Sequence, residues 1–119
     1  MRKKVSEIFS LPYGQDNVCC EPSMQEIEKS VHDKNLETGG FQDHLLELTA
    51  KWEQLHGQER YDRIRKYHAE RIAFFVVNGW DNYPIILKGD GREVKEGSHR
   101  LRAARYLRME EVEVEISGS

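Results

Sequence analysis

The sequence contains no apolar run close to the ~20 residues that a membrane span requires. Its basic start, Met1–Lys4, leads into polar residues instead of the apolar core of a secretion signal. Only two cysteines are present, Cys19 and Cys20, and neighbouring cysteines rarely reach disulfide geometry. These absences predict a cytoplasmic protein without a membrane segment, a disulfide framework or a cysteine-rich metal site.

The sequence also lacks an excess of basic residues. Its 21 acidic and 18 basic residues give a formal net charge of −3, which weighs against non-specific nucleic-acid binding. Four arginines nevertheless lie close together (Arg100, Arg102, Arg105 and Arg108), so the net charge does not exclude a local basic face. A length of 119 residues, with 38% hydrophobic and 33% charged, fits a single solvated domain.

Helical periodicity dominates residues 20–78. A first helix is expected to open near Pro22, with Met24, Ile27 and Val31 along one face. Gly39-Gly40 stops it or follows its end. Upstream, residues 5–9 alternate like a short strand, and residues 11–17 have the composition of a loop.

Two further helices are predicted, over residues 42–55 and 59–77. Their inward-facing residues recur at spacings of three and four, at Leu45, Leu48, Trp52 and Leu55 in one and at Tyr61, Ile64, Tyr67 or His68, Ile72 and Phe75 or Val76 in the other. Asn78-Gly79 closes the third helix, since both residues tolerate the left-handed conformation common at helix C-termini.

The pattern changes to strands after Trp80. Residues 83–87 form a β-type run, Lys88–Gly91 is a turn signal, and residues 92–95 return as a hairpin. A helix over 98–107 follows, and residues 111–116 alternate strictly as a strand. The residues expected to face inward are Leu101, Ala104, Leu107, Val112, Val114 and Ile116, with Arg102 and Arg105 facing outward.

These elements predict an α+β fold: a small mixed β-sheet with a hairpin and packed helices. One domain is expected over residues 1–119, helix-rich over 20–78, with the sheet and a phosphate-binding turn over 79–116.

The strongest chemical signal is the segment Gly97-Ser98-His99-Arg100 between a strand and a helix. Glycine permits a sharp turn and a close approach, and Ser98 is placed to cap the helix. A helix N-terminus attracts anions, and His99 and Arg100 add donors and charge there. From spacing alone, an ordinary Ser-capped helix with exposed His and Arg side chains explains the pattern slightly better, because Gly-Ser is common before a helix.

A resemblance favours the binding interpretation. The hairpin of residues 85–96, the turn 97–100, the helix with Ala103-Ala104 and the strand 112–116 resemble the ParB/sulfiredoxin nucleotide-binding core. The similarity extends upstream to about His68 and does not reach the first sixty residues.

The resemblance implies that Gly97, Ser98, His99 and Arg100 hold the phosphates of a nucleotide such as ATP or CTP, with Arg102 at the edge. Ser98 stands where sulfiredoxins have their reactive cysteine, so sulfinic-acid reductase activity is not implied. The chain has no room for the helix-turn-helix and dimerisation domains of a partition protein, which argues against a DNA-sliding clamp.

Three functions remain open. The first is nucleotide binding with slow triphosphatase or phosphotransfer activity, in which Glu96 acts as a base or helps to hold Mg²⁺, although a solvated turn carboxylate explains Glu96 as well. The second is a non-enzymatic plasmid or phage module that binds DNA or a protein partner. The third is a small-metabolite kinase, for which the sequence shows no clearly positioned carboxylate.

Overall fold

The computed structural model describes residues 1–11, 21–36, 54–80 and 84–117. The chain divides into two compact units, which are described separately. Unit 1 combines Met1–Val18 with Phe75–Ser119, and unit 2 is Cys19–Phe74. The predicted loop after Leu11, most of the predicted helix 42–55, Gly39-Gly40 and both cysteines lie outside the described residues.

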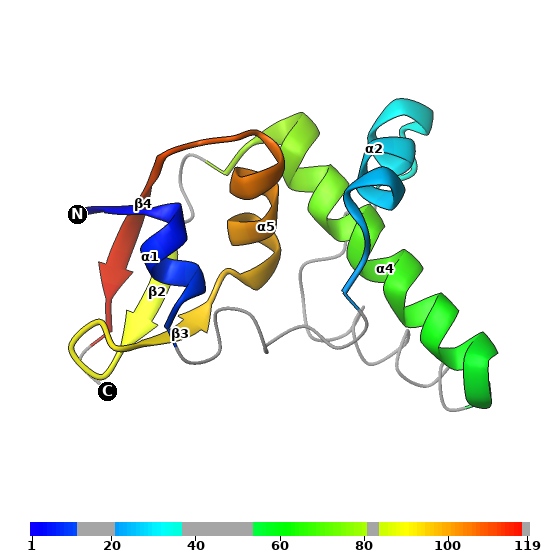
Figure 1. The fold of residues 1–119 in the computed structure, drawn as a ribbon, viewed down its shortest axis with the longest axis horizontal. Helices are drawn as coiled ribbons and strands as arrows, with labels where there is room; N and C mark the ends of the chain where they lie inside the picture. Colours follow the sequence, from blue (N-terminus) through cyan, green and yellow to red (C-terminus); the bar gives the residue numbers. More distant parts are fainter. Residues whose placement is uncertain (12–20, 37–53, 81–83, 118–119) are drawn as a thin grey trace. The chain divides into compact units, whose positions relative to one another are not determined.

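Unit 1 is built on a four-stranded mixed sheet with the strand order β1-β4-β2-β3. The strands are β1 (Arg2–Lys4), β2 (Ile85–Lys88), β3 (Glu93–Glu96) and β4 (Glu111–Ile116). The outer pairs β1/β4 and β2/β3 are antiparallel. The neighbouring strands β2 and β4 run parallel (Figure 1), and Ile85 is opposite Val114 in their register. This mixed sheet with its helices confirms the predicted α+β class.

The hairpin between β2 and β3 follows from its turn residues. Gly89, Asp90 and Gly91 take φ angles of 61°, 60° and 88°, in the left-handed region that Gly and Asp tolerate best. β4 confirms the predicted alternation at Val112 and Val114, which are buried. Ile116 was expected inside, but it is 37% exposed because it lies at the last position of the strand.

Two helices of unit 1 supply side chains to its core. They are α1 (Val5–Phe9) and α5 (Ser98–Tyr106), which contact one another, and α5 also contacts β2. The buried residues of the cluster are Val5, Ile8, Ile85, Leu87, Val94, Leu101, Ala104, Val112 and Val114. The glutamates that alternate with the valines of β4 are exposed, so the two faces of this strand differ in polarity.

Two predictions about these helices were wrong. Residues 5–9 form α1 and not a strand, because Val5 and Ile8 are three positions apart and enter the core together on one helical face. In a segment of five residues, apolar side chains at positions 5, 8 and 9 fit a short helix and an irregular strand pattern equally well. Leu107 was expected on the inner face of α5, but it caps the helix and is 44% exposed.

Unit 2 contains α2 (Met24–Asp33) and most of α4 (Gly57–Asn78), whose last residues belong to unit 1. α2 starts at a capping box: the Ser23 hydroxyl accepts from the Glu26 amide, and the Glu26 carboxylate accepts from the Ser23 amide, both at 3.1 Å. Ile27 is fully buried as expected, whereas Met24 is 45% exposed because it opens the helix.

α4 confirms the predicted third helix and its end. The Gly79 amide donates to the Phe75 carbonyl at 2.8 Å, and Gly79 has a φ of 76°. In the described part of the chain, no helix combines the length and the apolar character needed to cross a bilayer.

Candidate functional site

The predicted phosphate-binding turn, Gly97–Arg100, connects β3 to α5 in unit 1. Gly97 is the N-cap residue, with φ 110° and ψ 19°, and its carbonyl accepts from the Leu101 amide at 2.7 Å. The prediction that Ser98 caps the helix was therefore wrong, because Ser98 is already the first helical residue. Its side chain is buried, with 8% of the residue exposed.

Gly97 lies directly against the first residue of β2. A Cβ at this position would sit 3.0 Å from Cγ1 and 3.2 Å from Cα of Ile85. Both the backbone angle and this close approach require glycine. The packing therefore fixes the start of α5 beside Ile85.

Arg100 lies in the first turn of α5 and reaches back to the same strand. Its Nη1 donates to the Pro84 carbonyl at 3.0 Å, and its guanidinium carbon lies 5.9 Å from the centre of the Phe75 ring. The side chain is half-buried. These contacts hold the guanidinium beside the helix N-terminus in a defined orientation.

Arg102 was predicted to face outward, and this prediction was wrong because its side chain is buried. It is 1% exposed, its Nη1 donates to the Ser98 carbonyl at 3.1 Å, and its guanidinium lies 5.7 Å from the Phe9 ring. The structure thus places Arg102 beneath the turn, where it supports the backbone at Ser98. Sequence spacing on α5 could not reveal this burial, since the aromatic partner comes from α1.

The other predicted site residues are placed by their backbone. His99 is half-buried in the first turn of α5, between Ser98 and Arg100. Glu96 ends β3 opposite Ile86. The turn thus brings Gly97, Ser98, His99 and Arg100 together at the start of one helix. It does not bring the guanidinium of Arg102 to the surface.

A second group of basic residues lies at the other end of α5. The guanidinium of Arg105 stacks 4.6 Å from the Phe9 ring, beside a groove that Arg108 and Lys4 also line. The clustering of arginines in the sequence indicated part of this group. The sequence did not indicate that Phe9 and Lys4 belong to this group, because both are far from Arg105 and Arg108 along the chain.

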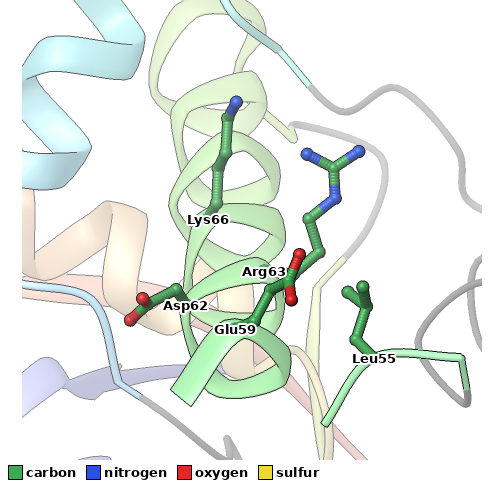
Figure 2. Close-up of a pocket in the computed structure, with 5 residues that line it drawn as sticks. All are labelled: Leu55, Glu59, Asp62, Arg63 and Lys66. Carbon is green, nitrogen blue, oxygen red and sulfur yellow. The ribbon is translucent and has the colours of Figure 1, made fainter. Parts of the chain in front are cut away.

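Unit 2 has a groove of about 650 Å³ near the start of α4, shown in Figure 2. Its charged residues are two acids and two bases, Glu59, Asp62, Arg63 and Lys66, and Leu55 supplies an apolar side chain. Acids and bases four apart on a helix are the usual arrangement of a solvated face, and Asp62 is paired with Arg65 at 2.9 Å. This balanced surface does not indicate a ligand.

Among the described residues, no group of three or more His, Cys, Asp or Glu side chains is arranged to hold a metal ion.

Comparison with protein-family models, with curated proteins and with solved structures found no match for this chain. The function is therefore argued from the residues alone.

Proposed function

We propose that this protein binds the phosphates of a nucleotide at the turn Gly97–Arg100. The observation that carries the proposal is Arg100, which stands in the first turn of α5 and is held by the Pro84 carbonyl and the Phe75 ring. A helix N-terminus carries partial positive charge, and an arginine already oriented beside it loses little freedom when it grips a phosphate. His99 adds a further donor in the same turn.

The supporting parts of the site have distinct roles in this proposal. Gly97 lets the helix begin against β2, and Arg102 holds the Ser98 carbonyl from within the core. Arg102 is thus a positioning residue, and not one that contacts phosphate. The ParB/sulfiredoxin resemblance implies ATP or CTP with Mg²⁺ as the ligand. An extension of the proposal is slow triphosphatase or phosphotransfer activity, for which Glu96 is the candidate base.

The thermal midpoint of unfolding tests this proposal. We expect ATP or CTP at millimolar concentration, with Mg²⁺, to stabilise the wild-type protein by about 1 kcal/mol or more. Arg100→Ala should bind at least about tenfold more weakly, since a charge-assisted hydrogen bond contributes roughly 1.5–3 kcal/mol. Losing the Pro84 contact should itself lower the free energy of unfolding by about 1 kcal/mol.

Arg92→Ala is the matched control. It removes the same charge from an exposed position in the hairpin turn of the same unit, and it should leave the nucleotide-induced shift intact. The proposal is wrong if no nucleotide shifts the midpoint of the wild type. It is also wrong if Arg100→Ala unfolds the protein, because Arg100 would then be a structural residue.

The alternative is a non-enzymatic module that binds DNA or a protein partner. Unit 1 contains as many basic as acidic residues, so the net charge of −3 resides in unit 2. Of the two partners, this acidic unit favours a protein over DNA, whose phosphates it would repel. A pull-down and gel shifts at low salt distinguish them.

A further inference from the structure

A groove of about 500 Å³ opens in unit 1 where the C-terminal end of α5 meets α1. Three of its lining residues are basic, Lys4, Arg105 and Arg108, and one is acidic, Glu110. Phe9 and Met109 add apolar surface. A volume of this size suits a small organic molecule.

Arg105 is held in place on the wall of this groove. Its guanidinium lies over the Phe9 ring at 4.6 Å, and the buried Arg102 approaches the same ring at 5.7 Å. Stacking on an aromatic ring fixes the plane of a guanidinium and so reduces the entropy lost when it binds an anion.

Arg108 enters the groove from a left-handed backbone position, with a φ of 58°. It follows Leu107 at the end of α5, where its amide donates to the Arg105 carbonyl and the Met109 amide donates to the Ala104 carbonyl, both at 3.0 Å. This is the helix-ending arrangement in which glycine is the favoured residue. Those bonds satisfy the carbonyls of Ala104 and Arg105 at the negative end of the helix, next to the three cations.

The charge of the groove points to an anion. The lining contains three cations and one carboxylate, so its net charge is positive and attracts an anion. The anion has to be compact, because unit 1 as a whole is neutral. Glu110 lines the groove, the exposed Glu7 and Glu111 adjoin it in the sequence, and the three carboxylates would repel a long phosphate backbone.

We propose that this groove binds a phosphorylated small molecule. Its phosphate lies between Arg105 and Arg108, and its organic part lies against Phe9 and Met109. The site is at the opposite end of α5 from the turn Gly97–Arg100 and shares none of the residues proposed to contact the nucleotide, although Arg102 also approaches its Phe9 ring.

Phenyl phosphate is a suitable probe, since it combines a phosphate with an apolar ring. In a residue-resolved NMR titration of the full chain, we expect saturable amide shifts over residues 4–9 and 105–110. Arg108→Gly should weaken this binding about tenfold, as expected for the loss of a charge-assisted contact. The thermal midpoint should not fall, because glycine relieves the left-handed backbone.

Lys34→Gly is the matched control. Lys34 takes the same left-handed conformation at the end of α2, with a φ of 57°, and carries the same charge, but it belongs to unit 2. It should change phenyl phosphate binding by less than about twofold. Three results would overturn the proposal: no shifts in the groove, wild-type affinity in Arg108→Gly, or tighter binding there of a short single-stranded oligonucleotide than of phenyl phosphate.

Discussion

Gly97 is the residue on which the geometry of the turn depends. Its left-handed backbone and its contact with Ile85 are two separate requirements, and each excludes a side chain. The sequence pattern suggested that glycine is present to let a ligand approach. The structure gives a second reason, the approach of β2, which holds whether or not a ligand binds.

Gly97→Ala should therefore be strongly destabilising. The left-handed angle of 110° and the contact of 3.2 Å with backbone predict a loss of about 2–5 kcal/mol in the free energy of unfolding. Gly79→Ala isolates the first effect, since φ is 76° there and no atom lies within 4 Å of the added Cβ. It should cost about 1–2 kcal/mol. Urea denaturation of both variants measures the difference, and equal losses would show that the contact with Ile85 contributes nothing.

Arg102 shows what periodicity misses at the scale of a single residue. Its position in the sequence suggests a solvated arginine, yet its guanidinium lies between the Ser98 carbonyl and the Phe9 ring. A long charged side chain can be buried when its charged group has hydrogen-bond or aromatic partners, and the tertiary fold determines which partners are nearby.

Among the elements, β4 and the β2–β3 hairpin were predictable because their signals are local. Strict alternation and a Gly-Asp-Gly turn each determine the backbone of a few neighbouring residues. β1 was not predicted, since Arg2-Lys3-Lys4 has no apolar pattern. It is a strand only because it pairs with β4, with Lys3 opposite Val112. The parallel pairing of β2 and β4 is likewise a non-local property.

The start of α2 supplies a prediction about pH. Burial raises the pKa of the Glu26 carboxyl, but hydrogen bonds from the Ser23 amide and from Arg65 outweigh it and lower the pKa below its usual 4.5. The Arg65 Nε lies 3.0 Å from this carboxylate. A carboxyl with a lowered pKa stabilises the folded state above its unfolded pKa, and this stability is lost as the pH falls through the folded value.

Glu26→Gln should therefore lower the free energy of unfolding at neutral pH by less than about 1 kcal/mol, since the pair with Arg65 is partly exposed. Gln retains an acceptor for the Ser23 amide, so the cap survives. The difference between wild type and variant should shrink as the pH falls below 4.5, and it should vanish once the pH is below the lowered pKa of Glu26 in the folded state. Urea unfolding followed by circular dichroism at neutral and acidic pH measures it. A difference that persists at low pH would contradict the assignment of this stability to the ionised Glu26 carboxylate. The control is Glu28→Gln, which changes an exposed carboxylate on the same helix.

For the whole molecule, the sequence was sufficient for the α+β class and for the existence of the last four elements of the chain. It was not sufficient for the assignment of the first residues, which belong to the same compact unit as the C-terminal sheet. That association rests on the pairing of β1 with β4 and on Val5 and Ile8 in the core, which are contacts between distant parts of the chain. The candidate turn was found from local sequence, whereas the groove at Phe9 depends on the same distant contacts.

The most direct test of the nucleotide site is a crystal structure with a non-hydrolysable ATP or CTP analogue and Mg²⁺. We expect phosphate oxygens at about 2.7–3.2 Å from the backbone amides of residues 98–100 and from the Arg100 guanidinium. A nucleotide bound elsewhere, or an unoccupied turn at saturating ligand, would contradict it.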